Sequence, residues 1–136
     1  MIDINTTIEP FILEDQFGTQ HNIQVRPKIL ICSFGKNTGQ LISEYFGEKG
    51  KDYLNQYDIE LIADVSHVPS LLRKTMIIPK MKKYSFEILL SSDKTFSEQF
   101  PHKEENLTIL KLENGVVKEI IYAKDADELK DAIEGI

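Results

Sequence analysis

The sequence of 136 residues has little cysteine and no long apolar run. Its single cysteine, Cys32, excludes an intrachain disulfide, a Cys-x-x-Cys redox pair and a zinc site built from cysteines. No run approaches the roughly 18 apolar residues of a membrane span, so we expect no transmembrane segment. The net charge of −6 argues against nonspecific nucleic-acid binding, which depends on neutralising phosphates with Lys and Arg.

The sequence also shows no pattern of a secretory leader and no sign of an internal domain boundary. The first residues, MIDINTTIEP, lack the charged and apolar regions of a secretory leader, so we expect a cytoplasmic chain. If the sequence is a trimmed mature form, the expectation changes to a periplasmic chain. There is no internal repeat, linker or low-complexity tract, which predicts a single domain over residues 1–136.

Strand and helix patterns alternate along the chain. Phe11 and Leu13 alternate with polar neighbours and a turn follows around Gly18, which predicts a hairpin over residues 10–25. Residues 28–34 are apolar on both faces, as is typical of a buried central strand. Further strands are predicted at 58–66, 86–92, 106–112 and 116–123, and helices at 37–57, 69–78, 93–100 and 125–136. This order predicts a three-layer α/β/α sandwich around a mixed sheet.

Single residues predict where the helices begin and break. Asn37 is expected to cap the first helix, with Gln40 as its capping-box partner. Gly47 and Gly50 each cost about 1 kcal/mol in a helix interior relative to Ala, so the first helix should be weak or bent near its middle. Pro69 suits the first turn of the helix that follows, and Pro79 should break or kink that helix.

Three motifs resemble those of a known family. FILEDQFGTQHNI is similar to the pattern apolar-x-Leu-x-Asp-x-x-Gly, which opens the peroxiredoxin and thiol-disulfide-oxidoreductase branch of the thioredoxin-like superfamily. YSFEILLSSDKTFSEQF resembles the insert that precedes the third core strand in that branch. LTILKLENGVVKEI resembles the strand, turn and strand that follow in the same branch. The resemblance extends over nearly the whole chain and implies a thioredoxin-like domain with an N-terminal hairpin.

The departures from the family pattern concern its chemistry. The redox dithiol would fall near Thr38 to Leu41, where there is no cysteine, and the peroxidatic Thr-x-x-Cys pattern has Leu41 in place of the cysteine. The cis-proline of the family would fall near Asn106, so we predict a trans bond between Glu105 and Asn106. The attacking group in this chemistry is a thiolate, which no residue at this junction can form. The chain is thus similar to a small set of bacterial thioredoxin-like proteins without the dithiol. It has no Gly-x-Gly-x-x-Gly motif, and we expect no cofactor.

The junction between the central strand and the first helix is a candidate anion-binding loop. Backbone N–H groups and the positive end of a helix converge there. Side chains add a positive charge and hydrogen-bonding groups, and two glycines allow close approach to the backbone. The candidate residues are Gly35, Lys36, Asn37, Thr38, Gly39 and Gln40. The alternative is a capped helix start with nothing bound, because every helix N-terminus offers such groups.

A second candidate is a run of basic residues without an acidic one between Pro69 and Tyr84. Such a run can dock an acidic partner or an anionic membrane surface, and the alternative is a solvated helix face. The basic residues are Arg73, Lys74, Lys80, Lys82 and Lys83. The partners that these two candidates predict are a protein or a small anionic ligand.

The remaining reactive side chains have plainer interpretations. Asp64, Ser66 and His67 lie too close in sequence for a catalytic triad, so we expect a strand end with Ser66 as a helix cap. His21 and the other histidines show no paired metal-ligand spacing, so we expect surface residues and no metal. Cys32 should be a small buried hydrophobe, and a lone redox thiol is the alternative.

Two functions follow from these observations. The first, which the missing dithiol favours, is a non-catalytic thioredoxin-like binding or scaffold module that uses the loop at 35–40 as a contact surface. The second is a redox protein, either a peroxidase or a mixed-disulfide carrier, that acts through Cys32 alone.

Overall fold

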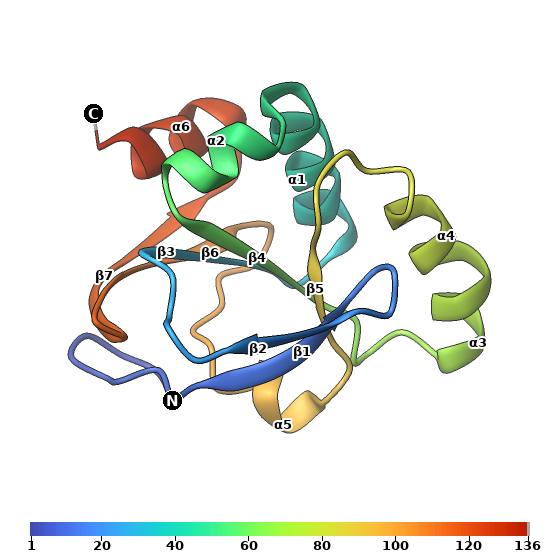
Figure 1. The fold of residues 1–136 in the computed structure, drawn as a ribbon, viewed down its shortest axis with the longest axis horizontal. Helices are drawn as coiled ribbons and strands as arrows, with labels where there is room; N and C mark the ends of the chain where they lie inside the picture. Colours follow the sequence, from blue (N-terminus) through green and yellow to red (C-terminus); the bar gives the residue numbers. More distant parts are fainter. Residues whose placement is uncertain (136) are drawn as a thin grey trace.

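Seven strands form one mixed sheet in the computed structural model, which describes residues 1–135 (Figure 1). Their order is β2-β1-β5-β4-β3-β6-β7. β3 pairs in parallel with β4, and β4 with β5, whereas β6 pairs antiparallel with β3 and β1 antiparallel with β5. The strands are β1 (Phe11–Asp15), β2 (Gln20–Ile23), β3 (Ile29–Ser33), β4 (Ile59–Asp64), β5 (Leu89–Ser91), β6 (Leu107–Glu113) and β7 (Val116–Ala123).

Helices cover both faces of this sheet. In Figure 1, α1, α2 and α6 lie on one face, α5 lies on the other, and α3 and α4 lie at one side. This arrangement confirms the three-layer α/β/α sandwich with an N-terminal hairpin. The helices are α1 (Lys36–Lys49), α2 (Lys51–Gln56), α3 (Ser70–Leu72), α4 (Ile78–Met81), α5 (Lys94–Ser97) and α6 (Ala126–Glu134), with a π-helical turn at Arg73–Ile77 between α3 and α4.

Strand β3 is the central strand that the sequence predicts, and all five of its residues are buried. Side chains alternate between the faces of a strand. Ile29 and Ile31 therefore enter the apolar core beneath α1 and α6, while Leu30 and Cys32 enter the core on the face of α5.

The N-terminal segment closes the second of these cores. Ile2 and Ile8 are buried there. The amide of Ile2 donates to the Gln99 carbonyl at 2.7 Å, and the amide of Val117 donates to the Thr6 carbonyl at 2.9 Å. Residues at the start of the chain thus pair with residues about a hundred positions later.

The ends of the helices agree only in part with the predictions. The cap of α1 is Gly35 and not Asn37, and the Gly35 amide donates to Thr38 Oγ1 at 3.2 Å. Asn37 is one residue inside the helix, and its side chain points to another segment. The break expected near the middle of the helix is confirmed at Gly50, which has a φ of +82° and separates α1 from α2.

Pro79 does not end its helix, which continues to Met81. In the preceding π turn, the Ile78 amide donates to the carbonyl of Arg73, five residues earlier. This turn shifts the hydrogen-bond register just before Pro79, so the helix tolerates the missing N–H of the proline.

The turn between β6 and β7 needs its glycine. Asn114 has a φ of +50° and Gly115 a φ of +81°, as expected for the two-residue turn of a hairpin. A Cβ on Gly115 would lie 2.5 Å from Nε of Arg26, so the Arg26 guanidinium packs directly on this turn.

Candidate functional site

A small cavity of about 140 Å³ lies at the carboxyl ends of β3 and β4. Its walls come from the start of α1, from the segment after β4, and from α4 together with Ile77, Tyr84 and Ile88. Ligands of open α/β sheets commonly bind outside the carboxyl ends of parallel strands. Lys36 and Lys80 both line this cavity, so the structure brings one residue of each predicted site together.

The predicted anion loop divides between this cavity and the protein interior. Gly35, Lys36, Gly39 and Gln40 line the cavity. Thr38 is buried, and its hydroxyl lies 2.8 Å from the hydroxyl of Ser33. The amide of Gly39 donates to the Gly35 carbonyl at 3.0 Å, and the Gln40 side chain donates to Glu44 at 3.0 Å instead of forming a capping box.

Asn37 contacts a segment 68 residues away in the sequence. Its side-chain amide donates to Oε2 of Glu105 at 2.6 Å. A carboxylate of the chain itself therefore lies beside the positive end of α1. Glu105 has a φ of +62°, and the predicted trans bond to Asn106 is confirmed.

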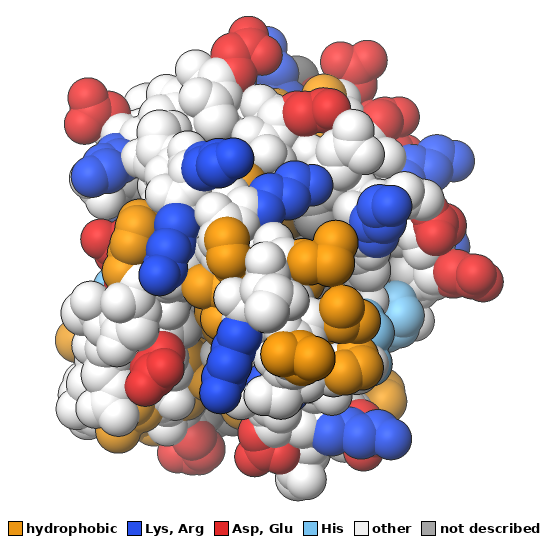
Figure 2. Space-filling model, turned by 90° about the vertical axis from the view of Figure 1, so that its right-hand side faces the viewer, with side chains coloured by type: hydrophobic (Ala, Val, Ile, Leu, Met, Phe, Trp, Pro, Cys, Tyr) orange, Lys and Arg blue, Asp and Glu red, His pale blue; other side chains and the backbone are white. Residues whose placement is uncertain are grey.

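The segment from α3 to α4 presents apolar and basic side chains together. Figure 2 shows the face of the molecule on which α3 and α4 lie, where apolar side chains are interspersed with Lys and Arg. Three large apolar side chains are exposed in this segment: Leu71, Leu72 and Met76. We call Lys36, Lys80 and these three residues the docking surface.

The predicted basic residues of this segment differ in their surroundings. The Arg73 side chain is half-buried, and its Nε donates to the Val68 carbonyl at 3.0 Å. Lys74, Lys82 and Lys83 are exposed. None of the five predicted basic residues forms an ion pair with any of residues 1–135.

Cys32 is buried on the face of the sheet opposite α1. Only 2% of its surface is exposed, which confirms the expected small hydrophobe. Burial raises the pKa of the Cys32 thiol, and the negative charge of Asp64 raises it further. The thiol therefore stays protonated at neutral pH, and a protonated thiol is not a nucleophile.

Asp64, Ser66 and His67 do not form a relay. The Ser66 hydroxyl donates to Oδ1 of Asp64 at 2.6 Å, and Nδ1 of His67 lies 3.8 Å from Oδ2 of the same carboxylate. Serine and histidine thus both contact the aspartate. This is not the nucleophile–base–orienter order of a triad, which the sequence analysis had rejected. The expectation that Ser66 caps a helix is wrong, because Pro69 occupies the cap position of α3.

His21 is only partly exposed, whereas the sequence analysis expected an ordinary surface residue. Its side chain is 23% exposed, and its Nε2 lies 2.8 Å from Oδ2 of the buried Asp15. Histidine-to-histidine spacing could not reveal this pair. The signal in the sequence was an aspartate, Asp15, before the hairpin turn and a histidine, His21, shortly after it.

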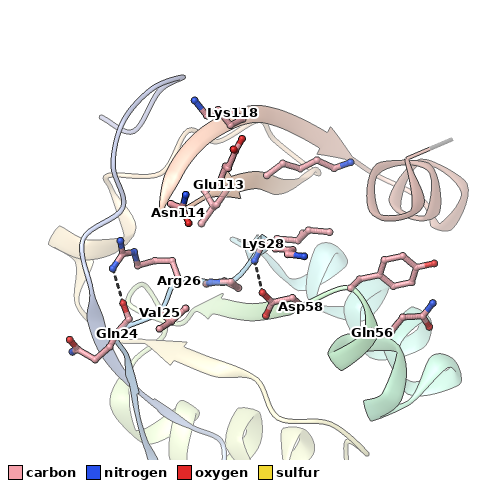
Figure 3. A pocket seen from close by; sticks show the side chains of 14 residues that line it. Gln24, Val25, Arg26, Lys28, Gln56, Asp58, Glu113, Asn114 and Lys118 are labelled. Carbon is pink, nitrogen blue, oxygen red and sulfur yellow. Dashed lines mark hydrogen bonds between the residues drawn. The ribbon is translucent and has the colours of Figure 1, made fainter.

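A wider hollow of about 840 Å³, which the sequence did not predict, lies at the opposite ends of β3 and β4 (Figure 3). Its polar groups are partly paired with one another. The Lys28 amide donates to Oδ2 of Asp58 at 3.1 Å, and Nη1 of Arg26 donates to the Gln24 carbonyl at 2.7 Å. Its walls come from four separate segments, which is why no local motif marks it.

Across residues 1–135, no helix is both long and apolar enough to span a membrane. No protein-family model matches the chain, and no curated protein matches it.

Several solved structures resemble it closely in fold. A protein assigned as thiol:disulfide interchange protein DsbE, from Chlorobium tepidum, superimposes with a TM-score of 0.66 at 12% identity, over 99% of this chain and 95% of that one. Peroxidoxin BcpB from Mycobacterium tuberculosis gives 0.62 at 12% identity, over 98% and 96%. The thioredoxin domain of a thiol-disulfide oxidoreductase from Bacteroides vulgatus gives 0.59 at 9% identity, over 99% and 98%. The chain therefore has the thioredoxin-like fold, with one cysteine and no Cys-x-x-Cys pair.

Proposed function

We propose that this chain is a non-catalytic thioredoxin-like binding module whose docking surface holds an acidic segment of a partner protein. One observation supports the proposal above the others. The cavity at the carboxyl ends of β3 and β4 has Lys36 on one wall and Lys80 on another, and the segment that carries Lys80 also exposes three large apolar side chains.

The size of the cavity favours a peptide side chain over a cofactor. Pockets for small molecules commonly enclose about 300–1,000 Å³, whereas this cavity encloses about 140 Å³. Ile77, Met81 and Tyr84 contribute apolar walls. One aliphatic side chain of a bound segment would fill this space while its neighbours remain outside.

The charges favour an acidic segment that lies on the α4 side of α1. Lys36 and Lys80 are exposed there. On the other side of the helix end, Glu105 accepts from Asn37 and repels a second anion. Exposed apolar patches rimmed by polar residues commonly mark protein–protein contacts, and Leu71 and Met76 supply such a patch.

The redox alternative has no comparable support. Cys32 points into the core on the face away from α1, so a substrate at the docking surface cannot reach its thiol. We expect the purified chain to be unable to reduce insulin disulfides in the presence of dithiothreitol, which is followed by turbidity. Turbidity at the rate of a dithiol thioredoxin would contradict the non-catalytic function.

The binding proposal is tested by NMR with a peptide that has one leucine between runs of glutamate. Amide shifts of the ¹⁵N-labelled chain should cluster at residues 35–40 and 69–84. The double variant Lys36→Glu and Lys80→Glu replaces two attractions by two repulsions. At about 0.2–1 kcal/mol for each exposed pair, it should weaken binding about tenfold. Lys130→Glu, an exposed lysine of α6, is the matched control and should bind like the wild type.

Three outcomes would contradict the proposal. The first is a set of shifts confined to other surfaces, and the second is equal weakening by the control variant. The third is binding to anionic phosphatidylserine vesicles without any binding to the peptide, which would assign the basic segment to a membrane surface. Binding that weakens as salt rises agrees with the proposed charge contacts.

A further inference from the structure

Three neighbouring segments of the sheet bring together chemically reactive side chains that are not part of the docking surface. β1 lies between β2 and β5, with Leu13 opposite His21 and Asp15 opposite Leu89. Asp15 and His21 are therefore diagonal neighbours across one strand pair. Glu87, two residues before Leu89, is the diagonal neighbour of Asp15 across the other pair.

The side-chain atoms of these three residues converge. His21 Nε2 lies 2.8 Å from Asp15 Oδ2 and 3.4 Å from Glu87 Oε2. One ligand atom from each of the three residues lies within 4.8 Å of the other two. The Asp15 side chain is only 3% exposed, whereas that of Glu87 is 52% exposed, so an ion can enter from the Glu87 side.

The hairpin turn fixes the buried carboxylate. Oδ1 of Asp15 accepts from the amides of Phe17 and Thr19 at 2.8 and 3.1 Å. Its other oxygen, Oδ2, is thereby directed at the imidazole of His21. The backbone orients this ligand atom, as supporting hydrogen bonds do for ligands in metal sites.

A third carboxylate adds negative charge beside this group. β4 and β5 pair with Ile62 opposite Leu89, and the same register two residues earlier places Glu60 beside Glu87. Carboxylates thus outnumber the single imidazole, which favours a bound cation.

We propose that Asp15, His21 and Glu87 form a binding site for a divalent transition metal ion, best satisfied by Zn²⁺. An imidazole nitrogen together with carboxylates suits Zn²⁺ better than Mg²⁺ or Ca²⁺, which prefer oxygen ligands alone. Bonds of about 2.0–2.2 Å in a tetrahedral site place ligand atoms about 3.4 Å apart. The distance from His21 to Glu87 already has that value, and Asp15 needs to withdraw by about half an ångström.

A bound ion would connect β2, β1 and the segment just before β5, because each contributes one ligand. The metal site shares no residue with the docking surface, so an experiment can refute it without refuting the proposed function. Its competitor is a purely structural pair in which His21 donates to Asp15 and closes the hairpin. The experiment must therefore measure the ion itself.

The test uses the untagged chain after treatment with a chelator, since a histidine tag would bind zinc. Titration calorimetry with ZnCl₂ should give one ion per chain, and Co²⁺ should give the visible absorption of a tetrahedral site. Glu87→Gln removes an exposed ligand without disturbing the core. It should weaken Zn²⁺ binding at least about tenfold, because loss of a residue that only supports a metal ligand already has that effect. Glu98→Gln, at an exposed glutamate of α5's end, should leave binding unchanged.

Histidine variants give a second comparison. His21→Asn should abolish one-to-one binding, while His67→Asn should not, although His67 also lies near a carboxylate. Absence of Zn²⁺ binding at micromolar concentrations would leave only the structural pair and overturn the proposal. Binding that survives Glu87→Gln unchanged, or is lost with His67→Asn, would place the ion elsewhere and would equally overturn it.

Discussion

Gln16 is the buried polar side chain whose removal has the most predictable effect on stability. Only 1% of its surface is exposed, and it forms three hydrogen bonds with the segment from the last residue of α4 to the residue before β5. Nε2 donates to the carbonyls of Met81 and Phe86 at 3.2 and 2.7 Å, and Oε1 accepts from the amide of Ile88 at 2.9 Å. The side chain thus anchors the connection that follows the docking surface.

The variant Gln16→Leu keeps the volume but removes all three hydrogen bonds. The Met81 carbonyl retains the amide of Tyr84 as a partner, so it loses least. The Phe86 carbonyl and the Ile88 amide would be left buried against methyl groups, at about 1–3 kcal/mol each. We expect a loss of about 3–4 kcal/mol in the free energy of unfolding, which is a large share of the 5–15 kcal/mol of a typical domain.

Urea unfolding followed by far-UV circular dichroism measures this loss. The midpoint should fall while the m-value stays constant, because the surface exposed on unfolding is unchanged. Hydrogen exchange should show lost protection at the Ile88 amide. Gln20→Leu, in the exposed start of β2, is the matched control and should stay within about 0.5 kcal/mol of the wild type. If Gln16→Leu costs less than about 1 kcal/mol, water or rearrangement satisfies these groups and the reasoning is refuted.

Three further predictions concern other parts of the chain. Native Cys32 should react with a thiol reagent at least about a hundredfold more slowly than in urea, since a central strand opens only at a cost of several kcal/mol; equal rates would show that the thiol is accessible. Gly115→Ala should lower the free energy of unfolding by about 2 kcal/mol, and Gly18→Ala should lower it by less. Both glycines have a φ near +80°, but only Gly115 faces a guanidinium, so equal losses would exclude that contact as the cause. Burial raises the pKa of Tyr53 and of Tyr45, whose hydroxyls lie 2.7 Å apart. The native state then holds protons that the unfolded state releases above pH 10.0, so stability should fall as pH rises beyond that value, and absorbance at 295 nm should show tyrosines that ionise late.

The sequence predicted the parts of the fold that depend on local patterns. The apolar run of β3, the hairpin turn at Gly18 and the helix break at Gly50 each follow from the residues at those positions. The cap of α1 was mispredicted because Asn37 found a stronger partner in Glu105, which no local rule anticipates. Pro79 does not end its helix because a π turn shifts the hydrogen-bond register just before it.

The sites were harder to predict than the strands. Lys36 and Lys80 belong to separate segments of the chain, and only the packing of α4 beside α1 brings them to one cavity. Gln16 resembles an ordinary turn residue, although its partners lie 65 to 72 positions away. The sequence therefore indicated which segments matter, while the distances between them depend on the register of the sheet.

The pairing of the N-terminal segment has a consequence for the order in which the chain folds during synthesis. Ile2 and Thr6 leave the ribosome before their partners at Gln99 and Val117, which follow about a hundred residues later. At about 5–20 residues per second, the segment waits on the order of ten seconds without its hydrogen bonds. During that time Ile2 and Ile8 are exposed to solvent, and the core beneath them stays open until β7 has been made.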